Sequence, residues 1–192
     1  MNQEQLRAVA DEAIEFAYNE IKIYGLPQPV AFDLSIQKGR LLAKELNANP
    51  TIVDIGIAMM DLKLGQAFKE KRVAEHVKMS ADAAMIFMKD HAVPDDVVRI
   101  VKNATEAHHG GIPFVSIEAE ICANADCYRF IHPKGVFLYL ATLGKRLDGF
   151  EEILSQAESK LDEKMRIVSL PIVRDELAPI YDIFKQYFAL AR

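Results

Sequence analysis

The sequence is poor in the residues that mark non-globular proteins. Only 9 Gly and 8 Pro occur among 192 residues, and 51% of the residues are hydrophobic. Disordered, collagen-like and low-complexity chains have a different composition. No apolar run approaches the roughly 18 residues that a membrane-spanning helix needs, so we expect no membrane partner. The chain is expected to fold as a single domain over residues 1–192.

Positive charge and cysteine are also scarce. The 23 Lys and Arg residues against 28 Asp and Glu residues give a net charge of −5. Such a chain has no overall attraction to phosphate backbones, so we do not expect nucleic acid as its main ligand. Cys122 and Cys127 are five residues apart in one expected helix, on different faces, and no secretory signal opens the chain. These features favour a cytoplasmic protein.

Strand signals are nearly absent, because no β-hairpin pattern and no sustained apolar/polar alternation occurs. Apolar residues instead recur at intervals of three and four, which predicts an all-α bundle of about eight or nine helices. The expected helices cover residues 2–24, 30–46, 51–63, 73–91, 95–109, 117–131, 136–147, 150–167 and 173–191. The polar segment 65–72 is expected to be a loop or a short exposed turn.

The helices expected over 136–191 carry more apolar side chains than a peripheral extension would expose. We therefore expect them to pack on the N-terminal helix 2–24, or on a second copy of the chain in a homodimer.

Four polar side chains fall on apolar or small-residue faces of four successive expected helices: Asp61, His76, His108 and Asp126. An unpaired buried charge or imidazole is costly, so these groups should converge on one pocket. His109 lies about 100° away from the apolar stripe that carries His108. Imidazole and carboxylate together suit Zn, Fe, Mn or Ni. A hydrogen-bonded polar core without metal is the alternative.

The helices that hold these residues resemble, in order and spacing, the HD-domain metal-dependent phosphohydrolases, an all-α family. The resemblance covers residues of about 30–131, which we expect to form an HD-like core that carries the N-terminal and C-terminal helices. It rests on four short motifs, namely Gly56-Ile57-Ala58-Met59-Met60-Asp61, Glu75-His76 with Ser80-Ala81, Ala107-His108-His109-Gly110-Gly111, and Asn124-Ala125-Asp126.

Two positions depart from the family pattern. Met60 stands where the family has the His of its His-Asp pair, and Ala31 stands at the spacing of its first His. The resemblance then implies that the primary metal site keeps only its two carboxylates. Metal ligands are expected among Asp61, His76, His108, His109 and Asp126. The first four resemble the second metal site of binuclear members, and Asp126 is expected close to them. We expect at most one divalent ion per chain (Fe, Mn, Ni or Zn), or none.

The resemblance implies hydrolysis of a small phosphorylated compound, with nucleotides among the candidates. Asp61 and Lys63 are the expected catalytic residues, and Arg72 and Arg129 the expected substrate-binding residues. Each cation has a plainer interpretation, because charged runs such as 69–72 are usually solvated and Arg129 could simply pair with Asp126. A second hypothesis is a non-catalytic HD-like protein that binds a ligand or oligomerises as a regulator.

Overall fold

The computed structural model describes all 192 residues and contains helices but no strand. Nine helices are eleven or more residues long, which confirms the predicted all-α bundle. The helices are α1 (Gln3–Tyr24), α2 (Pro29–Glu45), α3 (Pro50–Met60), α4 (Leu64–Lys69), α5 (His76–Asp90), α6 (Asp95–Ala107), α7 (Ile117–Ile131), α8 (Pro133–Leu143), α9 (Phe150–Ile167) and α10 (Pro171–Leu190), with a 3₁₀ turn, η1 (Val73–Glu75).

Local sequence signals set most of the helix ends. Asn2 caps α1 in a capping box with Gln5, and Gly25 ends that helix in the left-handed conformation, with φ of 77°. The side chains of Asn49 and Ser116 accept backbone N–H groups at the starts of α3 and α7.

The prediction of a loop or a short exposed turn over 65–72 is wrong for residues 65–69 and agrees with the structure only at residues 70–72. The first residues of this segment belong to α4, which buries Gly65 and Ala67 while Phe68 stays largely exposed. A helix of six residues is too short to show an apolar period, and the charged residues that follow it hid the pattern.

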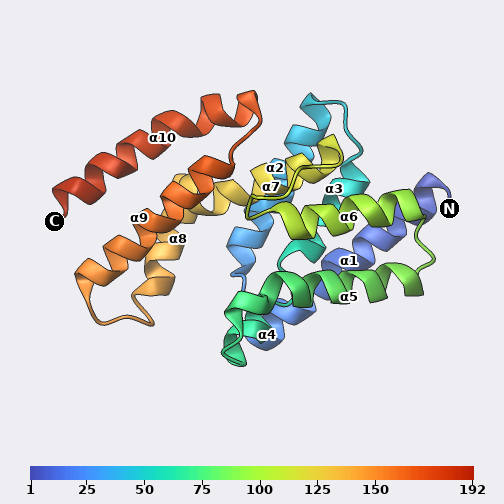
Figure 1. Cartoon of the computed structure of the whole chain (residues 1–192), viewed down its shortest axis with the longest axis horizontal. Coiled ribbons are helices and arrows are strands. Elements are labelled where there is room, and N and C mark those ends of the chain that lie inside the picture. Colours follow the sequence, from blue (N-terminus) through green and yellow to red (C-terminus); the bar gives the residue numbers. More distant parts are fainter.

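Helix α3 lies at the centre of the molecule, in contact with α1, α2, α5, α6 and α7 (Figure 1). All its residues from Ile52 to Met60 are buried. Its backbone packs closely on α7, because a Cβ at Gly56 would lie 2.6 Å from the Cys122 Sγ. This close packing fixes the position of α3 relative to α7. It therefore also fixes the position of Asp61, which directly follows α3.

Helices α8, α9 and α10 lie together on the far side of α7 from α1 (Figure 1). They pack on α7, on α2 and on one another, whereas α1 packs on α3 and α4. The expectation that they pack on the N-terminal helix is therefore wrong, and packing on a second copy stays a prediction. One cluster of 44 buried apolar residues runs from Val9 in α1 to Phe188 in α10.

No helix in the structure has both the length and the apolar character needed to cross a membrane.

Candidate metal centre

Asp61, His76, His108 and His109 meet where three helix ends come together. Asp61 is the C-cap of α3, His76 is the first residue of α5, and the two adjacent histidines directly follow α6. One potential ligand atom from each of these four residues lies within 4.8 Å of all the others. The structure thus brings together four of the five residues expected to bind metal.

Local contacts hold the turns that carry these residues. The backbone N–H of Lys63 donates to the Ser80 hydroxyl at 3.0 Å, which ties the turn after Asp61 to α5. Gly110 and Gly111 follow the two histidines with φ of 80° and 83°, a conformation that side chains with a Cβ disfavour. The sharp end of α6 turns His109 toward the cluster, although helical periodicity alone would have placed it elsewhere.

Each histidine is oriented through its Nδ1 atom. His76 Nδ1 lies 2.6 Å from the Val73 carbonyl oxygen, and His108 Nδ1 lies 2.7 Å from the Thr105 carbonyl oxygen. His109 Nδ1 lies 3.1 Å from Glu163 Oε1. Because all three partners can only accept, the Nδ1 atoms must carry the protons. In the neutral rings the Nε2 lone pairs therefore point into the cluster, as second-shell hydrogen bonds impose on metal-binding histidines.

The Nε2 atoms lack protein partners that would satisfy them. His108 is fully buried, and its Nε2 has no hydrogen-bond partner. His76 and His109 bring their Nε2 atoms to 3.1 Å of each other, which would oppose two lone pairs. A proton or a cation between them removes this repulsion. Ligand atoms at about 2.1 Å from an ion are themselves about 3.0–3.4 Å apart, so the separation of these two Nε2 atoms is that of two ligands of one divalent ion.

Asp61 divides its carboxylate between the histidines and a cation. Its Oδ1 lies 3.5 Å from Nε2 of both His76 and His108, and its Oδ2 accepts from Arg129 Nη1 at 2.5 Å. Burial alone would raise the pKa of Asp61, but the Arg129 charge outweighs it and holds the pKa well below its usual range. The carboxylate is therefore ionised and able to bind a cation through Oδ1.

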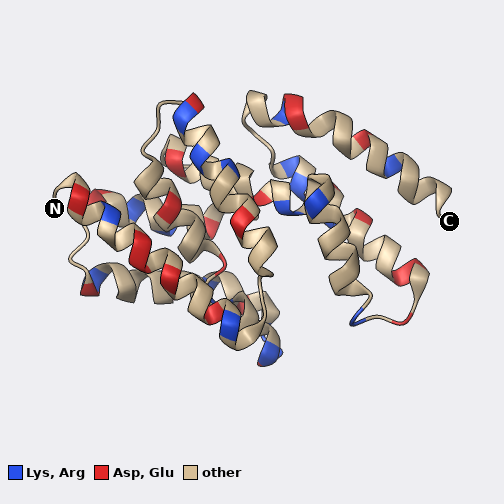
Figure 2. Ribbon diagram, turned by 180° about the vertical axis from the view of Figure 1, so that it is seen from behind, with Lys and Arg blue, Asp and Glu red and all other residues tan.

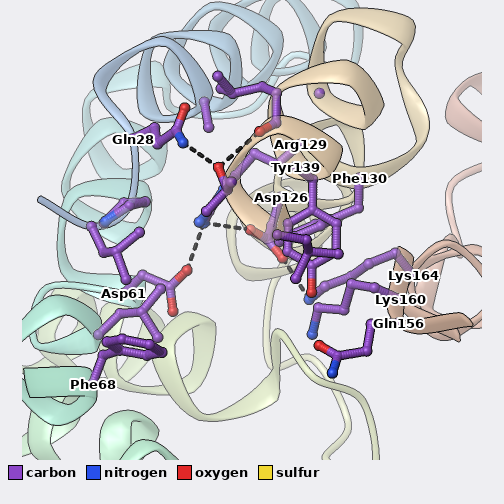
Figure 3. Close-up of a pocket in the computed structure, with 18 of the residues that line it drawn as sticks. Gln28, Asp61, Phe68, Asp126, Arg129, Phe130, Tyr139, Gln156, Lys160 and Lys164 are labelled. Atoms are coloured by element: carbon purple, nitrogen blue, oxygen red, sulfur yellow. Dashed lines mark hydrogen bonds and ion pairs between the residues drawn. The ribbon is translucent and has the colours of Figure 1, made fainter. Parts of the chain in front are cut away.

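Asp126 is not brought into the group of ligands. Arg129 Nη1 also donates to its Oδ1 at 2.7 Å, and Lys164 Nζ lies 2.6 Å from its Oδ2 (Figure 3). Burial would raise the pKa of Asp126, but the Lys164 and Arg129 charges lower it. Both its oxygens are engaged by protein cations, so Asp126 positions Arg129 in this structure.

The other expected cations differ in their placement. Lys63 turns away from the cluster, because its Nζ pairs with Glu20 at 2.9 Å. Arg72 is largely exposed and pairs with Glu70 and Glu75. Neither residue lines the cavity beside the cluster, whereas Arg129 does. The structure thus does not bring Lys63 or Arg72 to the site.

Helix α9 contributes three residues that the sequence analysis missed: Lys160, Glu163 and Lys164. The hydrogen bond from His109 and the pairing with Lys160 outweigh the effect of burial and lower the pKa of Glu163 to about 2. Burial lowers the pKa of His109, which keeps its ring neutral near pH 7. The signal for Lys164 was present, because it follows Ala157 and Leu161 on the apolar stripe of α9.

The chain is similar to two ribonucleases at low identity. It is 29% identical over 143 residues to Ribonuclease Y of Clostridium tetani (strain Massachusetts / E88) and 27% identical over 143 residues to Ribonuclease Y of Finegoldia magna. Each alignment covers 71% of this chain but only 25% and 26% of the respective relative. The chain spans about a quarter of the length of these relatives. No protein-family profile and no solved structure matches the chain.

Proposed function

We propose that the protein is a divergent HD-domain phosphohydrolase that uses one divalent ion. The proposal rests above all on the three Nε2 atoms that converge with Asp61 Oδ1, each ring being fixed through its Nδ1 proton. The HD-like order of motifs and the similarity to proteins named ribonucleases, which cleave phosphodiesters, favour phosphoester chemistry.

The residues around the cluster have separate roles in this proposal. Asp61, His76, His108 and His109 hold the ion, which would supply Lewis-acid polarisation of a phosphoryl group and acidify water. Glu163 keeps His109 in the tautomer that binds metal. Arg129 and Lys164, at the cavity edge, stabilise the negative charge that develops on phosphoryl oxygens.

Arg129 also accounts for the proposed limit of one ion. Its guanidinium bridges Asp61 and Asp126, and Ala31 lines the same cavity as Arg129. Met60 borders a small void of about 10 Å³ together with Arg129. The two positions where the resembling family has histidine thus each line a cavity that Arg129 also lines. We propose that this fixed cation takes the place of a second metal.

Metal analysis of the purified chain tests the proposal. After dialysis against Mn²⁺ or Fe²⁺ we expect about one ion per chain, and hydrolysis of an aryl phosphate that depends on this ion. His108→Ala should abolish both. His91→Ala is the matched control, because His91 Nδ1 makes the same kind of bond, to the Phe87 carbonyl oxygen, outside the cluster. Two ions per chain would contradict the ligand assignment.

The second candidate function is a non-catalytic regulator that binds a ligand in the same cavity. The observation that favours it is the pairing of Asp126 with Arg129 and Lys164, which leaves a carboxylate of the family pattern without a metal. Absence of both bound ion and hydrolysis across Mn²⁺, Fe²⁺, Ni²⁺ and Zn²⁺ would favour this function over the enzyme.

A further inference from the structure

A cavity of about 460 Å³ opens beside the cluster. Small-molecule sites typically measure roughly 300–1,000 Å³, so this cavity is of the size that holds one compact ligand. Asp61, His76 and His109 line it at the metal centre. Most of the remaining wall comes from α4 and from the region of α8 and α9. Helices α8 and α9 lie outside the part of the chain that resembles the HD domain.

Four cationic side chains line the cavity, and only one of them lacks a carboxylate partner. Arg129 and Lys164 bind Asp126, and Lys160 Nζ lies 2.8 Å from Glu163 Oε1. Arg146, which follows α8, forms no ion pair within 4.0 Å. Its guanidinium carbon lies 4.3 Å from the centre of the Phe68 ring. This contact joins α4 to the end of α8 and leaves the guanidinium donors of Arg146 free for a ligand.

Aromatic side chains line the cavity on more than one side. Figure 3 shows Phe68 on the side of Asp61, and Phe130 and Tyr139 across the space beside Lys160. The Phe130 and Tyr139 rings pack edge to face, with centroids 5.2 Å apart. Phe68 is 45% exposed although it is a large apolar residue. A flat apolar body between these walls would cover the Phe68 ring and remove apolar surface from water.

An extended RNA strand fits this site poorly. Proteins that bind single strands use a cationic groove and several stacking rings over about 4–16 nucleotides. Here three of the four cavity cations already pair with carboxylates, which leaves positive charge for one phosphate but no continuous cationic groove. Acidic and basic positions are also interspersed along the helices (Figure 2). The site therefore offers binding energy for one nucleotide-sized unit and little for the units on either side of it.

We infer that Phe68 and Arg146 are the specificity-determining pair of this site, and that they select a monomeric organic phosphate with a flat aromatic body over an RNA chain. The phosphate lies toward the cluster, on the part of the wall to which Arg129, Lys160 and Lys164 contribute, and the aromatic body packs on the Phe68 ring. The free guanidinium of Arg146 binds polar groups on the edge of that body. The inference rests on the proposed function, since it assigns the phosphate end to the metal centre.

Calorimetric titration of the full chain in EDTA tests the selectivity without any metal. The probes are the four ribonucleoside 5′-monophosphates, inorganic phosphate and a ten-residue oligoadenylate. At least one monophosphate should bind about tenfold or more tightly than inorganic phosphate and than the oligonucleotide. Phe68→Ala and Arg146→Gln should each weaken that monophosphate about tenfold, the size expected of a lost stacking or charged contact, and leave inorganic phosphate unchanged.

Two matched variants control for general effects. Phe150→Ala removes a phenyl ring at the start of α9 that is 60% exposed, somewhat more than Phe68. Arg99→Gln removes an exposed arginine of α6 that also lacks an ion pair, and neither residue lines the cavity. Both should bind like the unmodified chain.

Three results would overturn the inference: no monophosphate binds better than inorganic phosphate, the oligonucleotide binds as tightly as the monophosphates, or the controls lose as much affinity as the test variants. These titrations need no metal, so they test this inference separately from the proposed function. If only the proposed function fails, the chain will bind no metal and show no hydrolysis, but it will still select the monophosphate.

Discussion

Replacing Arg129 by methionine removes a buried charge while keeping a long, flexible side chain. Arg129 is 6% exposed, and its Nη1 atom bridges Asp61 at 2.5 Å and Asp126 at 2.7 Å. Removing one partner of a buried ion pair costs about 3–5 kcal/mol, because it leaves a charge without compensation. We expect Arg129→Met to lower the free energy of unfolding by about this amount.

The loss should arise mainly at Asp61. Asp126 keeps Lys164 at 2.6 Å, whereas Asp61 keeps only the imidazole nitrogens of His76 and His108 at 3.5 Å. Without Arg129 the pKa of Asp61 should rise, because the charge that lowers it is gone. Mn²⁺ at 100 times its Kd for the variant should then stabilise the variant by about 2.7 kcal/mol. The same concentration should stabilise the unmodified chain less, because Arg129 competes with the ion for Asp61 there.

Urea unfolding in EDTA at pH 7, followed by circular dichroism, measures the loss, and a second series with Mn²⁺ measures the recovery. Arg40→Met is the control, since Arg40 also pairs with a buried aspartate, Asp54, but is half exposed and leaves Arg7 in place at 2.5 Å. Its cost should be about 1 kcal/mol. A loss for Arg129→Met no larger than that of the control would refute the assignment of Arg129 as the cation that compensates the site.

Three further predictions concern the surroundings of the site. Met60→His should not raise the metal content above one ion per chain, because Arg129 still pairs with Asp61 and Asp126. The substitution should also destabilise the chain by about 1–3 kcal/mol, since Met60 is buried. Glu176→Gln should destabilise the chain at neutral pH. Partial burial would raise the pKa of Glu176, but Lys38 and Tyr128 lower it. In acid-unfolding curves, the difference in stability from the unmodified chain should therefore be complete above about pH 4.5 and vanish as the pH falls through the lowered pKa. Cys122 and Cys127 should resist a thiol reagent in the folded chain and react fully in urea, because both are buried and burial raises the pKa of both thiols; fast labelling of the folded chain would contradict the packing of α7.

Helical periodicity predicted the fold well because nearly every long helix buries one apolar stripe. The same logic found His108, which rides such a stripe on α6 and is fully buried. It did not find α4, whose six residues are too few for a period. It also left His109 off the buried face, because a regular helix was assumed where the chain turns after Ala107.

Closeness in sequence was a poor guide to the cations of the site. Lys63 and Arg72 lie near Asp61 and His76 in the chain, but each finds a glutamate partner away from the cluster. Lys164, which lies about a hundred residues after Asp61, is 1% exposed and reaches Asp126 from α9. Such pairs depend on how α9 packs against α7, and this packing is a tertiary fact that no local pattern encodes.

The hydrogen bond from His109 to Glu163 closes a loop of 54 residues, and Glu163 lies in the second-last helix of the chain. While the chain is being synthesised, a segment that ends before α9 contains all four potential metal ligands but lacks the carboxylate that orients one of them. Contacts of such sequence separation form late, after local helices and hairpins. In the proposed function, binding of an ion with full affinity would therefore be one of the last events of folding, after α9 has completed the wall of the cavity.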